Sequence, residues 1–203
     1  MGAVRKDADV PESAATLIRF ADRPATSWAN GRGTTVVLWR TPDGDSVADV
    51  RLSIATVSES GPFSLLPGID RMLMPLAAGG LTLRIDGSLF DVARYEVVGF
   101  AGEAETSSVD VSDAGHDLNL MVRRGIGSPR LESLRLDGPH VIDEPGLVAV
   151  VALSGDVRWN GATLGFGDTV LVAGASPDPA GEARQVELDG TGVVALVGVS
   201  RAA

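Results

Sequence analysis

Apolar and polar residues alternate along several short stretches of the chain. In the clearest stretch, Val50, Leu52 and Ile54 are separated by Arg51 and Ser53. Because successive side chains of a strand point to opposite faces, this pattern predicts a strand with one apolar and one polar face. Further strands are expected at 35–39, 81–85, 118–122, 146–153, 169–172 and 193–197.

Turn signals between these stretches set the fold class. Asp86-Gly87 and Asn160-Gly161 are two-residue hairpin signals, because both pairs tolerate the positive φ that such turns need. No apolar pattern keeps the helical period of 3.6 for more than about ten residues. Many short strands with glycine-rich turns are typical of a β-sandwich or barrel. We therefore predict an all-β protein. A pattern of strand, glycine, strand and hairpin recurs in both halves of the chain and suggests two related jelly-roll units.

The expected units divide the chain beyond its middle. Residues 1–15 carry mixed charge and small side chains, which predicts a disordered tail. A loop-like stretch at 125–139 separates the two halves, so the expected units are 16–130 and 131–203. Residues 131–136 fit either a strand or one helical turn.

Charge and hydropathy exclude several kinds of partner. The 203 residues include 17 basic and 27 acidic ones, a formal net charge of −10. Nucleic acid and anionic membranes need a basic field, so we expect neither as a partner. No apolar run reaches the ~18 residues of a membrane span, and the first residues lack the apolar core of a signal peptide. A cytoplasmic protein is expected.

Residue types also limit the chemistry. Cysteine is absent, and His116 and His140 are the only histidines. Thiolate or three-histidine metal sites are therefore excluded within one chain, and we expect no metal and no cofactor. Lys6 is the only lysine, so a cationic site must be built from arginine, whose planar guanidinium suits a carboxylate.

Two candidate site segments are loops rich in glycine. Trp28 and Asn30 lie beside two glycines, where exposed backbone N–H groups could hold an anion. The segment 61–71 holds Phe63 and Ser64, and its apolar content must cover either the core or a pocket. The alternative for each loop is a turn that only packs on the core.

Two further candidate segments are strands with a polar face. Arg51 and Ser53 share one face, and so do Asn119 and Arg123. If these faces line the inside of a barrel, the arginines point into a cavity and need an anionic partner. If they face water, they are ordinary surface residues.

These four segments, in this order, resemble the motifs of the HutD/Ves family, of which HutD is the histidine-utilisation accessory protein. The likeness covers about 17–124. The matching residues are Trp28-x-Asn30-Gly31-x-Gly33-x-Thr35, Arg51-x-Ser53-x-Ala55, Gly61-Pro62-Phe63-Ser64-x-x-Pro67-Gly68-x-Asp70-Arg71, Phe100-x-Gly102-Glu103 and Asp117-Leu118-Asn119-x-Met121-x-Arg123-Arg124.

The resemblance implies two cupin-like (RmlC-like jelly-roll) units without a metal. It also implies a small-molecule binder that moderates histidine catabolism, with a carboxylate ligand such as urocanate or formylated glutamate. The chain departs from the family pattern at Arg32, where a glycine is usual.

The leading hypothesis is a cavity that binds a small organic acid. Arg51 and Arg123 would pair with its carboxylate. Trp28 and Phe63 would form apolar walls, and the remaining site residues would supply hydrogen bonds: Asn30, Ser53, Ser64 and Asn119.

Two alternatives use the same segments differently. An isomerase, lyase or hydrolase would need a general acid or base, and the candidates are Asp70, Glu103, Asp117 and His116. The second alternative is a protein-interaction module with a vestigial pocket. Asp70 and Arg71 are expected to form a structural pair, and a homodimer is compatible with the sequence.

Overall fold

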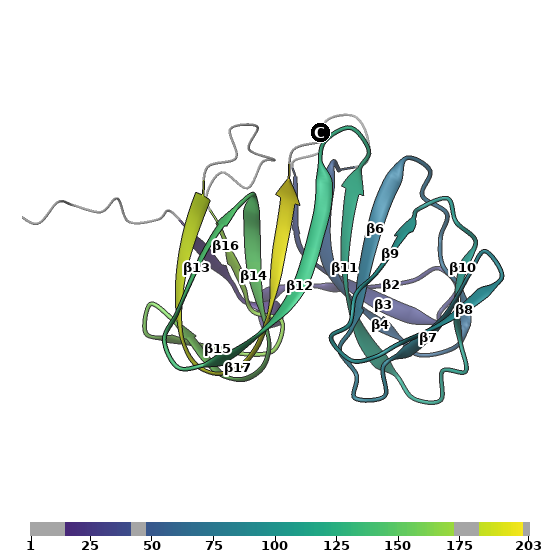
Figure 1. Ribbon diagram of the computed structural model, residues 1–203. Coiled ribbons are helices and arrows are strands. Elements are labelled where there is room, and N and C mark those ends of the chain that lie inside the picture. Colours follow the sequence, from purple (N-terminus) through teal and green to yellow (C-terminus); the bar gives the residue numbers. More distant parts are fainter. Residues whose placement is uncertain (1–14, 42–47, 173–182, 201–203) are drawn as a thin grey trace, which may run out of the picture.

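The computed structural model describes residues 15–41, 48–172 and 183–200 (Figure 1). Almost all of the predicted tail at 1–15 lies outside these residues. The described part of the chain folds into β-strands, with a single 3-10 turn, η1, at Phe20–Asp22. The prediction of an all-β protein is confirmed. Within the same residues, no helix is long and apolar enough to cross a membrane.

The first half of the chain forms two antiparallel sheets. The larger sheet has the order β2 (Ala25–Ser27), β3 (Gly33–Arg40), β4 (Val50–Val57), β11 (Gly115–Arg123), β6 (Ile69–Pro75) and β9 (Val98–Ala101). The smaller sheet has the order β5 (Gly61–Pro62), β10 (Thr106–Val109), β7 (Leu81–Ile85) and β8 (Ser88–Val92). Figure 1 shows the two sheets facing each other.

The second half is built around one seven-stranded sheet. Its main path runs β1 (Thr16–Ile18), β16 (Thr169–Leu171), β14 (Leu147–Trp159), β17 (Ala183–Ser200) and β12 (Ser128–Asp137). β13 (His140–Pro145) pairs with β17, and β15 (Ala162–Leu164) pairs with β14. Residues 131–136, which fitted a strand or a helical turn, lie in strand β12.

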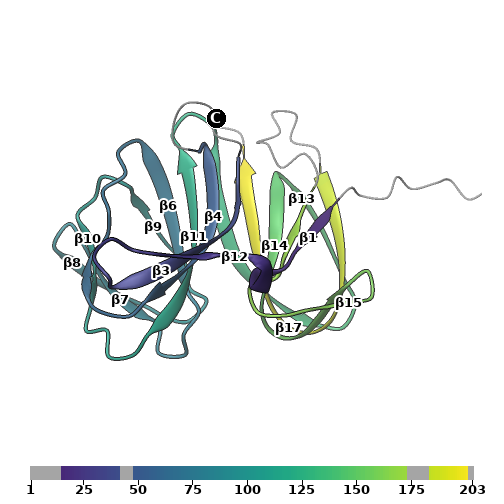
Figure 2. The same cartoon turned by 180° about the vertical axis from the view of Figure 1, so that it is seen from behind.

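The N-terminal strand joins the second half, unlike the expected unit of 16–130. β1 pairs with β16, and the chain then crosses to the first half, as Figure 2 shows from behind. Asp168 holds this crossing: its carboxylate accepts hydrogen bonds from the Phe20 N–H at 2.9 Å and from Arg19 Nη1 at 2.7 Å. These partners lie almost 150 residues apart, so no local pattern could reveal the pairing.

The largest apolar cluster lies between the two halves. Strands β4 and β11 turn their even-numbered apolar residues outward, against β14 and β17 of the second half. The most deeply buried members of this cluster include Leu38, Leu52, Leu120, Ala149, Ala195 and Val197. Since both halves supply the same core, we expect them to unfold together.

The two interiors are filled differently. Inside the second half, an apolar cluster that includes Val150, Leu164 and Val194 fills the space between its strands. In the first half, a smaller cluster around Leu73 and Leu83 fills only one part of the interior. The rest of that interior carries the polar odd-numbered residues of β4 and β11.

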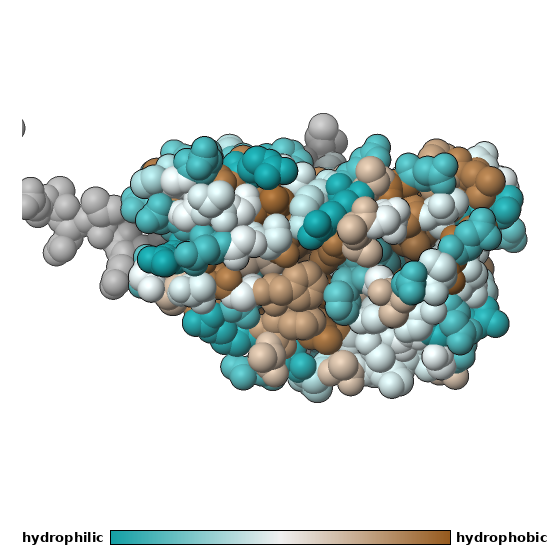
Figure 3. All heavy atoms as spheres, turned by 90° about the horizontal axis from the view of Figure 1, so that it is seen from below, coloured by the Kyte–Doolittle hydropathy of each residue, from teal (hydrophilic) through white to brown (hydrophobic). Residues whose placement is uncertain are grey.

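Aromatic side chains bridge the two halves at the surface. The Phe166 ring packs edge-on against Phe20 at 5.6 Å and lies 5.2 Å from the His116 ring, which belongs to the first half. His116 Nδ1 is also within 3.0 Å of Thr56 Oγ1. Figure 3 shows apolar side chains gathered near the middle of the underside.

Candidate functional site

A cavity of about 470 Å³ lies inside the first half. Three neighbouring strands, β4, β11 and β6, line it with their odd-numbered residues, while their even-numbered apolar residues face the core between the halves. The alternation that predicts a strand therefore also separates the cavity from the core. The polar face of β4 lines the inside of a barrel.

The register of these strands arranges the lining in rows. Arg51 lies opposite Met121, and Met121 lies opposite Arg71 on its other side. The next row holds Ser53, Asn119 and Leu73, and the third holds Ala55, Asp117 and Pro75. A strand rises about 3.3 Å per residue, so the rows of Met121 and Asp117 are about 13 Å apart. The arginines and the carboxyl group belong to opposite ends of one cavity.

The arginine row carries two charges that no described residue neutralises. Arg71 is buried, with 7% of its surface exposed, and Arg51 is partly buried. Both Nε atoms are buried without a hydrogen-bond partner, and within the described residues neither guanidinium forms an ion pair. An unpaired buried charge is costly, so an anion in the cavity would be stabilised there.

The surroundings of the two guanidinium groups disfavour their charge. Burial, and next the neighbouring Arg51, lower the pKa of Arg71 to about 10. Burial, and next Arg40, lower the pKa of Arg51. The Arg71 guanidinium carbon lies over two rings, 5.4 Å from the centroid of Phe63 and 4.9 Å from that of Phe100. These cation–π contacts fix its position and offset part of the cost of burial.

Asp117 is the carboxyl group at the other end. Its side chain is 3% exposed, and its Oδ2 atom is buried without a hydrogen-bond partner. Burial raises the pKa of Asp117 to about 7. A group with this pKa can gain or lose a proton near neutral pH, which is the property of a general acid or base.

Hydrogen bonds hold the polar residues between the two ends. Asn119 Nδ2 donates to the Asp117 backbone carbonyl at 3.2 Å, which leaves the Asn119 side-chain oxygen as an acceptor. The Trp28 indole N–H donates to Thr35 Oγ1 at 2.8 Å. Trp28 therefore forms a wall of the cavity and also orients a hydroxyl group in it.

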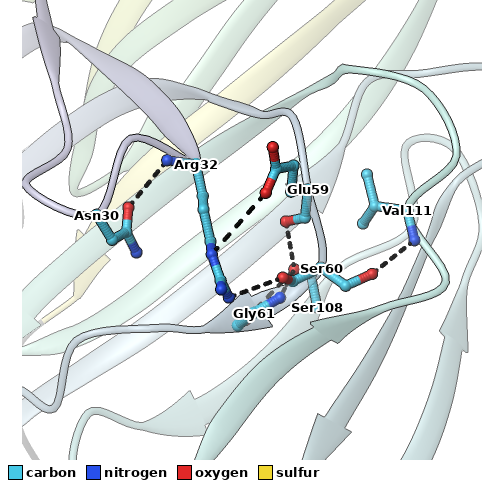
Figure 4. Close-up of polar contacts among 7 residues, drawn as sticks. All are labelled: Asn30, Arg32, Glu59, Ser60, Gly61, Ser108 and Val111. Carbon is cyan, nitrogen blue, oxygen red and sulfur yellow. Dashed lines mark hydrogen bonds and ion pairs between the residues drawn. The ribbon is translucent and has the colours of Figure 1, made fainter.

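The loop at 28–33 is tied to a neighbouring loop by Arg32 (Figure 4). The Arg32 backbone N–H donates to Asn30 Oδ1 at 3.0 Å, and Arg32 Nη1 donates to the Ser60 carbonyl at 3.1 Å. A Cβ at Gly61 would overlap the end of the Arg32 side chain, so a larger residue there would displace this guanidinium. The arginine that departs from the family pattern thus connects the Asn30 and Gly61 segments.

A second hollow of about 650 Å³ continues beyond the arginine row. It shares Arg51, Leu66 and Met121 with the cavity and extends to Arg23, Thr26 and Trp39. Arg51 therefore borders both spaces.

Seven of the eight residues predicted to bind a ligand line the cavity: Trp28, Asn30, Arg51, Ser53, Phe63, Ser64 and Asn119. The eighth, Arg123, is not among the lining residues and forms an ion pair with Asp49 at 2.7 Å. The expected Asp70–Arg71 pair is wrong. Neighbours on a strand point to opposite faces, so Arg71 enters the cavity while Asp70 pairs with Arg124.

Of the four candidate acids and bases, Asp117 alone lines the cavity. Glu103 and Asp70 both bind Arg124, which lowers the pKa of Glu103 to about 2 through its hydrogen bonds to that guanidinium. His116 contacts Thr56 and Phe166 instead. Sequence reasoning missed Arg71 as a lining residue, although its spacing from Leu73 placed both on one strand face.

The lining does not fit a metal ion. It offers two guanidinium groups, which repel cations, and a single carboxyl group. No group of three or more metal-binding side chains occurs in the described parts of the chain.

Two β-barrels with a shared core and a cavity in one of them define a two-barrel protein with a cupin-like fold. The fold is similar to that of the Cupin 2 conserved barrel domain protein from Leptotrichia buccalis, at a TM-score of 0.52 and 13% identity over 91% of this chain and 96% of that one. The chain belongs to the HutD family, whose family model matches residues 20–196. The predicted fold and family are confirmed.

Two solved structures are more similar. The conserved protein of unknown function PA5104 from Pseudomonas aeruginosa PAO1 has a TM-score of 0.78 and 27% identity, over 93% of this chain and 100% of that one. HutD from Pseudomonas fluorescens SBW25, in a formate condition, has a TM-score of 0.77 and 25% identity, over 94% of this chain and 100% of that one.

Curated relatives match over a shorter stretch. An uncharacterized 21.2 kDa protein in the hutC 3′ region of Pseudomonas putida is 34% identical over 107 residues, 52% of this chain and 56% of that protein. Protein Ves of Citrobacter koseri is 30% identical over 103 residues, which are 50% of this chain and 54% of that protein. The chain spans a little over half the length of these relatives.

Proposed function

We propose that this protein binds a small carboxylate in the cavity of its first half. The observation that carries the proposal is the pair Arg51 and Arg71, two guanidinium groups that share one row and have no ion-pair partner among the described residues. A carboxylate there would accept charge-assisted hydrogen bonds from both. Because the chain carries a net charge of −10, this row is a local positive site in an acidic protein.

The remaining lining suits a small organic acid. Ser53 and Asn119 occupy the next row, and Trp28 and Phe63 supply apolar walls. A concave, partly apolar space with a few placed polar groups is the usual form of a small-molecule site. Candidate ligands are urocanate and formylated glutamate, and the formate condition of the Pseudomonas fluorescens structure makes formate a further probe.

Calorimetry with matched arginine variants tests the proposal. We expect Arg51→Ala to weaken binding of the best carboxylate by about 2–5 kcal/mol, the usual cost of breaking a buried charge pair. Arg123→Ala is the control, because Arg123 lies outside the cavity and should leave affinity unchanged. Equal affinity of the wild type and Arg51→Ala would remove Arg51 from the site.

We also propose that binding moderates histidine catabolism. The support is membership of the HutD family and the position that its name gives to the Pseudomonas putida relative, in the hutC 3′ region. A strain that lacks the gene can be complemented with either the wild type or Arg51→Ala. The two complemented strains should differ in growth on histidine. Equal growth with both alleles would contradict a role for the bound ligand in the pathway.

A second candidate function is catalysis in the same cavity. The observation that favours it is the buried, unpartnered Asp117, whose pKa burial raises to about 7. An isomerase, lyase or hydrolase could use it as a general acid or base. Mass spectrometry of each incubated acid tests this: turnover that Asp117→Asn abolishes without loss of binding supports an enzyme, and binding without turnover supports a carrier or sensor.

A further inference from the structure

Asp117 faces the cavity with an acceptor that no other described residue uses. Its Oδ2 atom is buried and lacks a hydrogen-bond partner, although the side chain is only 3% exposed. A buried polar atom left unpaired costs free energy, and such atoms in proteins are nearly always paired. The arginine row does not pair with it, because the two rows lie about 13 Å apart along the strands.

A second acceptor lies one row nearer to the arginines. Asn119 uses its amide nitrogen on the Asp117 backbone carbonyl at 3.2 Å, so the amide oxygen is the part left to accept. Asn119 and Asp117 are on the same strand two residues apart, and both line the cavity. This end of the cavity therefore offers two acceptors beside the second amide N–H of Asn119, whereas the guanidinium groups of Arg51 and Arg71 offer only donors.

We propose that the ligand is a carboxylate with an N–H donor at its opposite end, and that Asp117 binds this N–H group. The inference rests on the proposed carboxylate site and names the class of molecule that fits it. Amides, amidines and imidazoles with a carboxylate on a short chain belong to this class. A simple monocarboxylate satisfies only the arginine row and leaves Asp117 Oδ2 unpaired.

Three probes of equal size test the far end alone. Glutaramate, 5-oxohexanoate and glutarate share a carboxylate and a three-carbon chain, and they end in an amide, a methyl ketone and a second carboxylate. Calorimetry at pH 8, where Asp117 is ionised, should show glutaramate binding about tenfold or more tightly than 5-oxohexanoate, because hydrogen bonds to charged groups are the stronger ones. Glutarate should bind more weakly than glutaramate, because its second carboxylate meets the Asp117 carboxylate.

Variants assign the preference to Asp117. Asp117→Leu, with Asp117→Ala as a second variant if the larger side chain disturbs folding, should bring the ratio of the two affinities close to one without weakening 5-oxohexanoate. Arg71→Met is the matched control: it should weaken all three probes and keep the preference for glutaramate. Circular dichroism and thermal unfolding verify that each variant is folded.

The outcomes separate the inference from the proposed function. Equal binding of glutaramate and 5-oxohexanoate, lost in Arg71→Met, would overturn the N–H donor and leave the carboxylate site standing. Tightest binding of glutarate would also overturn it, since Asp117 would then donate a proton rather than accept one. If none of the three probes binds at a concentration of about 10 mM, both the N–H donor and the proposed carboxylate site are overturned.

Discussion

Replacing Asp117 with asparagine should remove a pH dependence from the stability of the ligand-free protein. Burial raises the pKa of Asp117 from 3.8 to about 7, and desolvation is the only cause of the shift. In the unfolded chain the carboxyl group loses its proton near pH 4. In the folded protein it keeps the proton until about pH 7. Between these values the folded state binds more protons, so stability falls as pH rises.

The size of the effect follows from the shift. One pKa unit corresponds to 1.36 kcal/mol, so the carboxyl group costs the folded state about 4 kcal/mol above pH 7 and about 3 kcal/mol of this develops between pH 5 and pH 8. Asparagine has nearly the same shape and does not titrate. The free energy of unfolding of Asp117→Asn, relative to wild type, should therefore rise by about 3 kcal/mol over this range.

Urea unfolding at pH 5, 6, 7 and 8 measures this difference. The buffers should contain no carboxylate, because a bound anion would stabilise the fold by mass action. Glu103→Gln is the control. Hydrogen bonds to Arg124 lower the pKa of Glu103 to about 2, so the stability that its carboxylate contributes develops above pH 2 and is nearly complete by about pH 4.5. The difference between Glu103→Gln and wild type should therefore stay constant from pH 5 to pH 8. A difference between Asp117→Asn and wild type that stays constant from pH 5 to pH 8 would refute a buried, titrating Asp117.

Three further predictions concern the fold and the arginine row. Leu120→Ala should cost about 2–5 kcal/mol in urea unfolding and keep a single transition, because Leu120 is buried in the shared core; two transitions would contradict that core. Arg71→Met should raise the melting temperature of the ligand-free protein by removing a desolvated charge worth about 1–3 kcal/mol, and an unchanged temperature would count against it. Asp168→Ala should cost about 2 kcal/mol and speed hydrogen exchange in β1, since it frees Phe20 N–H and Arg19.

Much of the cavity could be predicted from alternation alone. In β4 and β11 the apolar residues occupy every second position, so Arg51, Ser53 and Asn119 had to share faces opposite to the core. The same rule applied to β6 would have found Arg71, two residues before Leu73. Asp70 and Arg71 are adjacent in sequence, but adjacent residues of a strand point to opposite faces, so they do not pair.

Other features depend on contacts that no local pattern carries. Arg123 is the last residue of β11 and does not line the cavity. It forms an ion pair with Asp49, which lies 74 residues earlier. The lack of a partner for Asp117 becomes visible only when three strands are aligned in register. The crossing of β1 to the second half depends on Asp168, whose partner Phe20 lies 148 residues earlier in the chain.

The alternating faces of β4 and β11 restrict how this protein can change. Each step along these strands passes from a residue that the cavity uses to a residue that the second half needs, as with Arg51 and Leu52. Neither strand offers a run of neutral positions. New ligand preferences should therefore arise most readily in the loops around Asn30 and Ser64, where side chains are exposed and a substitution disturbs only one of the two surfaces.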